Sequence, residues 1–286
     1  MKTFLIATDF SAASRNATQY GIELARAFNG RVILLNAYQP LPVVATDSLV
    51  TAMPVDLGEL VKQQLEAEAD LFSSERATRL EIVAKEGPVA DTILGAAKEM
   101  NADLILAGMK GAGKTARKLF GSTVTSLAKK SAIPVIVIPE GVSYRDPATI
   151  ALANDISSQS GTHLLDALRG LVEKFHSKLY VVRVVTKRSN EVVEVLNRPW
   201  NLKTMVADLE PLFEFPVDKN IDKALSEFVS THHVDLLAMV PHKESLPERW
   251  FLRSNTKEMI FKTNIPLLVL PEQSHRLGKH THSVLF

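Results

Sequence analysis

Short apolar runs alternate with helical patterns along the first half of the chain. The runs lack the polar–apolar alternation of a half-exposed strand, so they predict strands that are buried on both faces of a parallel sheet. They cover Phe4 to Ala7, Val32 to Leu35, Leu80 to Ala84, Leu104 to Ala107 and Val135 to Ile138. We therefore expect a doubly wound, Rossmann-like α/β fold, with its ligand crevice at the carboxyl ends of the strands.

Helical patterns fill the gaps between these runs. Ser14 is expected to cap the first helix, which continues to Asn29 and stops at Gly30. The other helices are expected at Leu57 to Thr78, Val89 to Met100 and Ser122 to Lys130. Five apolar runs separated by helices are typical of a parallel sheet with helices on both faces.

The second half repeats this order of motifs. The segment around Asp9 (ATDFS) returns around Asp155 (ANDIS), and the eight residues after Ala132 (IPVIVIPE) return after Asn264 (IPLLVLPE). The offset between the copies falls from 146 residues at Asp155 to 132 in the last strand, so the second copy is shorter in its middle. We predict two similar five-stranded domains, residues 1–143 and 144–272, and a tail over 273–286.

Composition and charge narrow the class of protein. With 286 residues, 46% hydrophobic and 23% charged, the chain has the make-up of a two-domain soluble protein. A formal net charge of +1 provides no general attraction to nucleic acid or to an acidic membrane, so neither is expected as a partner. The chain contains no cysteine, and no further ligand at metal-binding spacing joins His232, His233 and His242. No metal site is therefore expected.

The start of the chain carries no signal peptide pattern, since its apolar run soon reaches Asp9. No stretch approaches the ~18 apolar residues that a membrane span needs. The sequence therefore predicts a cytoplasmic protein.

Two glycine patterns overlap after the fourth predicted strand. The first, Gly-x4-Gly-Lys-Thr, is met by Gly108 with Gly113, Lys114 and Thr115, and it matches the P-loop. A P-loop usually follows the first strand, however, and Gly121 interrupts the helix that Lys114 should open. A P-loop ATPase or kinase is kept as an alternative.

The second pattern, Gly-x2-Gly-x9-Gly-Ser, suits its position better. Gly108 would end a strand and let the backbone approach a ribose or phosphate, and Gly111 would permit a tight reversal. Gly121 and Ser122 would open the last helix and direct free amides at an anion, with Ser122 as the cap. Lys110 is one of several basic residues that would favour a polyphosphate.

This loop, the early Asp9 and the Ile-Pro before the last strand resemble the universal stress proteins, and the resemblance covers nearly the whole chain as a tandem pair. It implies an adenine nucleotide α hydrolase-like fold, contacts from the Asp9 segment to adenine or ribose, and an adenine pocket lined by the end of the second strand. Members commonly continue Gly-Ser-x-Thr, but Val124 stands here, which weakens the case for metal-assisted hydrolysis. The implied ATP-binding residues are Thr8, Asp9, Phe10, Ala37, Gly108, Lys110, Gly111, Gly121, Ser122 and Thr123.

The second copy keeps Asp155 and Ser254 but replaces all three glycines, by Val240, Lys243 and Arg253. A Cβ at these positions should block close backbone approach, so we expect a degenerate second domain and one ATP per chain. Each last strand would be an exposed apolar edge. The two edges can pair within one chain, and the resemblance implies such a pseudo-dimer, with a homodimer as a further step.

The sequence thus predicts a universal stress protein that binds ATP, with or without Mg²⁺, and has a nucleotide-responsive regulatory role. No general base lies beside a nucleophile in its motifs, so at most weak ATP hydrolysis is expected. An interaction module without nucleotide is the remaining alternative.

Overall fold

The computed structural model describes residues 2–40, 56–73, 80–109, 121–153, 165–185, 204–240 and 265–271. The first half forms strands β1 (Thr3–Ala7), β2 (Arg31–Tyr38), β3 (Leu80–Glu86), β4 (Leu104–Met109) and β5 (Val135–Pro139). The second half forms β6 (Thr149–Ala153), β7 (Lys178–Val182), β8 (Leu212–Glu214), β9 (Leu236–Met239) and β10 (Leu267–Val269). All five strands predicted in the first half are present, and each is extended by one to three residues at one or both ends.

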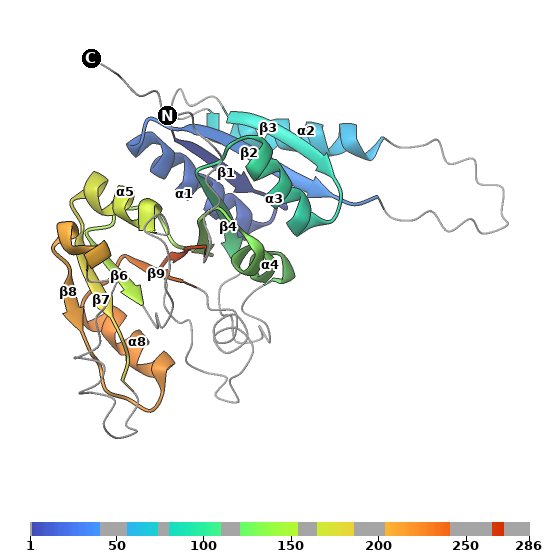
Figure 1. Cartoon of the computed structure of the whole chain (residues 1–286). Coiled ribbons are helices and arrows are strands. Elements are labelled where there is room, and N and C mark those ends of the chain that lie inside the picture. The colour runs from blue at the N-terminus through green and yellow to red at the C-terminus, as the bar shows by residue number, and fades with distance from the viewer. Residues whose placement is uncertain are drawn as a thin grey trace, which may run out of the picture.

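The described strands form one ten-stranded sheet in the order β3-β2-β1-β4-β5-β10-β9-β6-β7-β8 (Figure 1). Each half has the same internal order, because 8-7-6-9-10 repeats 3-2-1-4-5. Pairing is parallel within each half. The α/β fold with parallel-dominated sheets that the apolar runs predicted is therefore confirmed.

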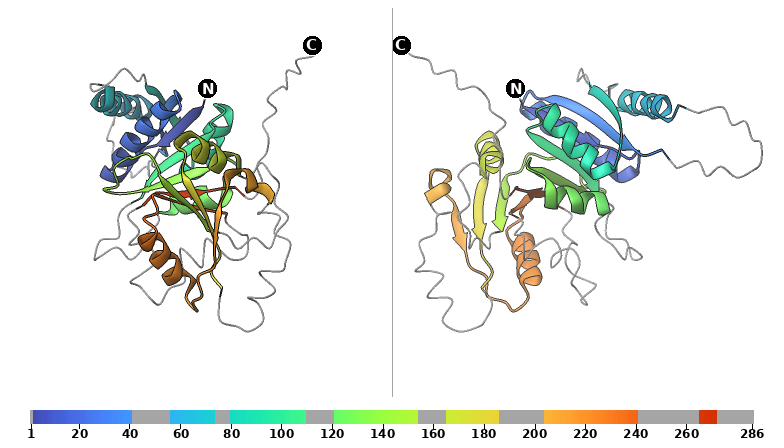
Figure 2. Two further views of the ribbon diagram at one scale, coloured as in Figure 1. Left: turned by 90° about the vertical axis from the view of Figure 1, so that its left-hand side faces the viewer. Right: turned by 45° about the vertical axis from the view of Figure 1, so that its right-hand side comes forward.

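The halves are joined through their last strands, β5 and β10, which pair antiparallel. Leu268 lies opposite Ile136, between the pairs Leu267–Val137 and Val269–Val135. Figure 2 shows β10, in red, between the two halves. This pairing covers two apolar strand edges that would otherwise be open to association with other chains.

Helices cover both faces of the sheet. In the first half they are α1 (Ala12–Ala27), α2 (Leu57–Ser73), α3 (Val89–Glu99) and α4 (Ser122–Lys130). The second half contributes α5 (Asp166–Phe175), α8 (Ile221–Thr231) and the short 3-10 helix η2 (Ala207–Leu209). The predicted end of the second helix, residues 74–78, lies outside the described residues. None of the described helices is both long and apolar enough to cross a membrane.

The ends of α1 differ from their prediction. Its N-cap is Ser11, whose hydroxyl accepts a hydrogen bond from the Ser14 amide at 3.2 Å, so Ser14 lies one turn inside the helix. At the other end Asn29, and not Gly30, adopts the left-handed conformation (φ 47°), which asparagine tolerates. Gly30 is needed for space instead, since a Cβ there would lie 2.4 Å from the Phe4 ring.

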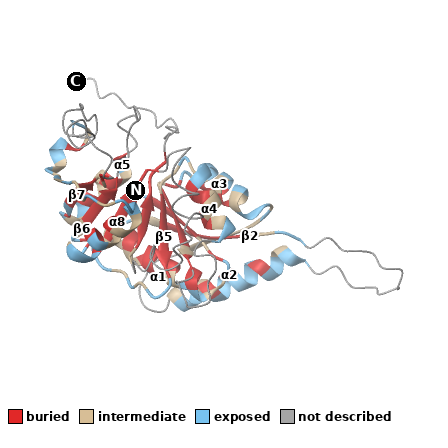
Figure 3. Cartoon of the chain, turned by 90° about the horizontal axis from the view of Figure 1, so that it is seen from below, coloured by how far each residue is buried: buried red, intermediate tan, exposed pale blue. Residues whose placement is uncertain are grey.

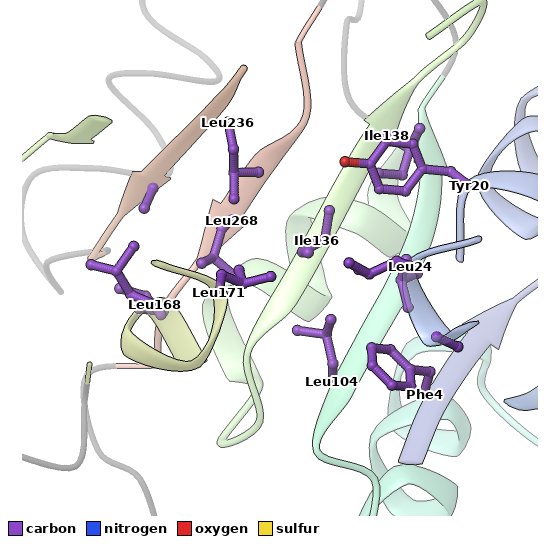
Figure 4. Close-up of a cluster of buried hydrophobic side chains, with 14 of the residues drawn as sticks. Phe4, Tyr20, Leu24, Leu104, Ile136, Ile138, Leu168, Leu171, Leu236 and Leu268 are labelled. Atoms are coloured by element: carbon purple, nitrogen blue, oxygen red, sulfur yellow. The ribbon is translucent and has the colours of Figure 1, made fainter. Parts of the chain in front are cut away.

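Alternate residues of each strand enter two cores, one under each helical layer. One core packs α1, α2 and α5 against the sheet, and the other packs α3, α4 and α8 against the opposite face. Ile136 of β5 and Leu268 of β10 both belong to the first core, which is continuous across the junction between the halves (Figure 4). Figure 3 shows that the buried residues follow the sheet, whereas α2 exposes much of its surface. Burial of each such aliphatic side chain contributes about 1.5–3 kcal/mol to folding. The side chains at the junction between the halves therefore stabilise the fold.

One hydrogen bond recurs at the start of each half. The Thr3 amide donates to the Asp103 carboxylate at 2.8 Å, and the Thr149 amide donates to the Asp235 carboxylate at 2.9 Å. In both halves it ties the first strand to the residue just before the fourth. The two halves thus share a side-chain contact as well as a strand order.

Candidate functional site

The candidate site lies at the carboxyl ends of β1 and β4, which are neighbours in the sheet. After β1 the chain enters α1 on one face, whereas after β4 it reaches α4 on the other face. In doubly wound sheets, ligands bind at the switch point, where the connections that follow two neighbouring strands leave on opposite faces of the sheet.

A tight turn, Thr8 to Ser11, leads from β1 into α1. The buried Thr8 hydroxyl oxygen accepts a hydrogen bond from the Phe10 amide at 3.0 Å, and the Asp9 carboxylate accepts one from the Ser11 amide at 3.1 Å. Between them Phe10 has a φ of 63°, a left-handed conformation that bulky aromatic residues rarely adopt. Strain of this kind persists only where the surroundings enforce it, and it is concentrated at functional sites.

The Asp9 carboxylate is exposed at this turn. Partial burial would by itself raise the pKa of Asp9, but hydrogen bonds from Ser11, with a contribution from Ser14, outweigh it and hold the pKa below its usual value. The group is therefore ionised at neutral pH. It can accept hydrogen bonds from hydroxyl or amino groups of a ligand.

Gly108 lies inside β4, opposite Ile138, and the strand continues to Met109. A Cβ on Gly108 would lie 2.2 Å from the carbonyl oxygen of Ala13 and 2.7 Å from the amide nitrogen of Ser14. The prediction that this glycine ends the strand is thus wrong. Its missing side chain makes room for the first turn of α1, which brings the Asp9 turn against β4.

The N-terminus of α4 lies at the same end of the sheet. Gly121 is the N-cap, with extended backbone (φ −64°, ψ 155°), and Ser122 is the first helical residue, so the prediction of Ser122 as the cap is wrong. Within the described part of the chain, no side chain caps this helix end. The amides of exposed Ser122 and half-buried Thr123 therefore belong to an uncapped first turn that can bind an anion.

Val124 and Gly121 differ in what their surroundings require. Val124 is buried together with Leu127, so its side chain packs in the core. A Cβ at Gly121 would meet no described atom within 4 Å. The extended backbone of Gly121 also means that no helix runs from Lys114 directly into α4.

Several predicted residues lie outside the described residues. They are Lys110, Gly111, Gly113, Lys114 and Thr115 in the first half, and Asp155, Lys243, Arg253 and Ser254 in the second. Val240, which aligns with Gly108, is described and is buried just beyond β9. Within the described ranges, no group of three or more His, Asp or Glu side chains could hold a metal ion.

Strand β2 contributes to the site through Asn36 as well as through the predicted Ala37. Ala37 is half-buried on the α3 face of the sheet. The Asn36 side chain points to the other face, and its amide donates to the Thr8 carbonyl oxygen at 2.8 Å, which ties the ends of β1 and β2 together. Sequence reasoning missed Asn36, although a buried asparagine in an apolar strand is a usable signal.

Glu68 of α2 was also missed. Its carboxylate is buried beside Thr8, with Oε1 2.6 Å from the Thr8 hydroxyl and Oε2 3.2 Å from Nε of Arg15. A signal was present, because Glu68 interrupts the apolar stripe of Val61, Leu65 and Phe72 on that helix. Nothing in the local pattern, however, indicated which strand this stripe would face.

The universal stress protein family model matches residues 1–139. Universal stress protein Sll1654 of Synechocystis is 31% identical over 138 residues, which make up 48% of this chain and 85% of that protein. Universal stress protein Rv2624c of Mycobacterium tuberculosis is 26% identical over 138 residues, which are 48% of each chain, so the match spans about half of that relative. A crystal structure of a universal stress protein from Archaeoglobus fulgidus has the same fold over 94% of this chain and 98% of its own, with a TM-score of 0.66 at 15% identity.

Proposed function

The chain belongs to the universal stress protein family, and from that premise we propose that its first half binds ATP, with or without Mg²⁺, as a regulatory ligand. One observation carries the proposal. The Asp9 carboxylate follows β1 and the uncapped N-terminus of α4 follows β4, and these two strands are neighbours in the sheet. An acceptor for a nucleoside and amide donors for phosphates are thus supplied by adjacent strands.

We assign the residues to two roles, one group to the nucleoside and the other to the phosphates. The turn formed by Thr8, Asp9 and Phe10 holds the nucleoside, beside the end of β2 at Ala37. The amides of Gly121, Ser122 and Thr123 bind the phosphates. Lys110 and Gly111, which lie outside the described residues, are proposed as further phosphate contacts on the basis of the sequence pattern. Gly108 acts indirectly, because it lets α1 bring the Asp9 turn into place.

The proposed role is a slow or non-catalytic one. A general base works best when its pKa lies near the operating pH, whereas hydrogen bonds hold the pKa of Asp9 below its usual value. We expect at most weak ATP hydrolysis, and we propose that ATP occupancy conveys the stress signal. One ATP per chain is expected, because Val240 carries a Cβ at the position that Gly108 leaves open.

The pairing of β5 with β10 supports a second part of the proposal. The strand edge that ends each half is covered by the other half of the same chain. We therefore interpret the chain as a covalent pseudo-dimer in which one half keeps the nucleotide site. Association of two chains would then need a different surface.

Calorimetry of ATP binding to the full chain tests the proposed function. We expect micromolar affinity, about −8 kcal/mol, and loss of most of it in Gly121→Val, whose side chain would cover the amides of the first turn. This variant is informative because a Cβ at Gly121 meets no described atom within 4 Å, so its first side-chain atom has room. Gly95→Ala on α3, also without a described neighbour, is the matched control. Millimolar or absent binding to the wild-type chain would overturn the proposal.

Two further measurements separate the alternatives. Steady ATP turnover that is lost in Lys114→Ala but survives in Gly121→Val would indicate a P-loop enzyme instead. For an interaction module without nucleotide, the expected result is that purified and then denatured protein releases no adenine nucleotide.

A further inference from the structure

The buried stripe of α2 contains one residue that does not match the others. Val61, Leu65 and Phe72 pack into the core, while Glu68 at the same face is only 2% exposed. Burial of a carboxylate is unfavourable unless it is paired and hydrogen-bonded, and an apolar residue of similar size is often at least as stable there. Stability alone therefore does not account for a glutamate at this position.

Both oxygens of Glu68 have partners at the base of the candidate site. Oε1 lies 2.6 Å from the Thr8 hydroxyl, and Oε2 lies 3.2 Å from Nε of Arg15. The Arg15 side chain is 51% exposed, so the ion pair reaches from the buried stripe to the solvent. Glu68 thereby connects α2 to the turn after β1, sixty residues away in the chain.

The Thr8 hydroxyl has a single hydrogen, which decides the direction of the network. Its oxygen lies near both Glu68 and the hydroxyl of Ser14, at 2.6 Å and 3.1 Å. The carboxylate is the closer and the charged acceptor, so it takes the hydrogen. The lone pairs of Thr8 are then left to accept the hydrogen bond from the Phe10 amide at 3.0 Å.

We propose that Glu68 is a positioning residue of the nucleotide site. Through the Thr8 hydroxyl it holds Phe10 in its left-handed conformation and so presents the adjacent Asp9 carboxylate to the nucleoside. Arg15 donates from Nε to the second carboxylate oxygen of Glu68 on the solvent side, so both oxygens of the buried group have partners. This inference rests on the proposed nucleotide-binding function, and it makes α2 part of the site although none of its residues need touch the ligand.

The test uses the full chain with Glu68→Leu and Thr8→Val. We expect ATP binding to weaken about tenfold in each, equal to about 1.4 kcal/mol. Without ligand, hydrogen exchange of the Phe10 amide should become at least about tenfold faster, since it loses its fixed acceptor. The melting temperature of Glu68→Leu should stay the same or rise, because an apolar side chain completes the stripe. A residue with a purely structural role would show the reverse pattern, a lower melting temperature with unchanged exchange at Phe10.

Two further variants serve as controls. Glu66→Leu lies on the exposed face of the same helix and should leave both ATP affinity and Phe10 exchange unchanged. Thr8→Ser keeps the hydroxyl and should restore most of what Thr8→Val loses. If Glu68→Leu does not fold, the comparison of Thr8→Val with Thr8→Ser still decides whether the hydroxyl that Glu68 binds holds Phe10 and supports ATP binding.

The outcomes for the two proposals are distinct. Wild-type chain that fails to bind ATP overturns the proposed function, while the exchange measured without ligand still decides whether Glu68 holds Phe10. If the wild-type chain binds ATP and Glu68→Leu and Thr8→Val bind it equally well with wild-type exchange at Phe10, the inference about Glu68 is wrong and the proposed function stands.

Discussion

Gly108 on β4 lies directly against Ala13 in the first turn of α1, so that a Cβ on the glycine would be 2.2 Å from the Ala13 carbonyl oxygen. The contact joins two segments that are far apart in the sequence and that both lead into the candidate site. A glycine that belongs to a nucleotide-binding pattern is therefore also required for the fold. Substitutions in this pattern need to be interpreted one residue at a time.

Gly108→Ala is expected to lower the free energy of unfolding by about 2–3 kcal/mol, because the added methyl group overpacks a backbone contact that cannot move easily. Urea unfolding at neutral pH measures this. In contrast, Gly95→Ala within α3 should raise stability by about 0.5–1 kcal/mol, since the new Cβ meets no described atom and alanine favours helix. Equal stability of the two variants would contradict the close approach of α1 to β4.

Gly121→Asp should change stability and ligand binding in opposite directions. An aspartate at the N-cap accepts hydrogen bonds from the first-turn amides of α4 and suits the helix dipole, which adds about 0.5 kcal/mol. It also occupies the amides proposed to bind phosphate and repels the anion. We expect a slightly higher melting temperature together with loss of ATP binding by calorimetry. Gly121→Ala, which provides no acceptor, should keep binding, and tight binding by Gly121→Asp would argue against a phosphate site at this helix.

The stability of the chain should fall above pH 10 because of two tyrosines whose rings meet edge to face at 5.1 Å. Burial, followed by the charge of Asp235, raises the pKa of Tyr20, and burial, followed by the hydrogen bond to Asp146, raises the pKa of Tyr144. Unfolded tyrosine ionises near pH 10. Below that pH their contribution is fully present, and above it the unfolded state loses protons that the folded state keeps, so stability decreases.

Urea unfolding at pH 8, 10 and 11 measures this dependence. The slope can reach about 1.4 kcal/mol per pH unit for each group. The double variant Tyr20→Phe/Tyr144→Phe should flatten it, whatever its stability at pH 8. An equally steep decrease in the double variant would show that other groups are responsible.

Asp103 and Asp235 should make similar contributions to stability, because each accepts the amide hydrogen bond of Thr3 or Thr149 at the start of a half. Alanine at either position leaves that amide without its charged acceptor and is expected to cost about 2 kcal/mol. Asparagine keeps an acceptor and should cost less. Thermal unfolding of the four variants provides the comparison, and a neutral Asp235→Ala would mean that the recurring hydrogen bond has no common role.

The elements of the first half were predictable because their signals are local. Runs such as Val135 to Ile138 are buried on both faces of the sheet, and burial of that kind is recorded directly as a run of apolar residues. Helix ends were less predictable. Ser14 and Asn29 show this, because several polar residues near each end of α1 could serve as a cap, and packing against Phe4 decided the place of Gly30.

The candidate site was predictable in its location and in part of its residues. Gly121 was identified from the spacing of the glycines and Asp9 from the resemblance to the family. Asp9 follows β1, and Gly121 caps the helix that follows the neighbouring strand β4. Glu68 was not identified, since its role depends on how α2 packs beside Thr8. The role of Gly108 was misjudged for the same reason, as its partner is the backbone of α1.

The sequence by itself determined which elements form, their order and the repeat of that order, because apolar periodicity and turn residues act over a few neighbouring positions. That the two last strands can pair was expected from the sequence and the resemblance. Only the tertiary structure decided the antiparallel register of β5 and β10, that Gly108 makes room for Ala13, and that Glu68 reaches Thr8. These contacts join residues about sixty to more than a hundred and thirty positions apart. Their geometry depends on how whole layers pack, which no local pattern records.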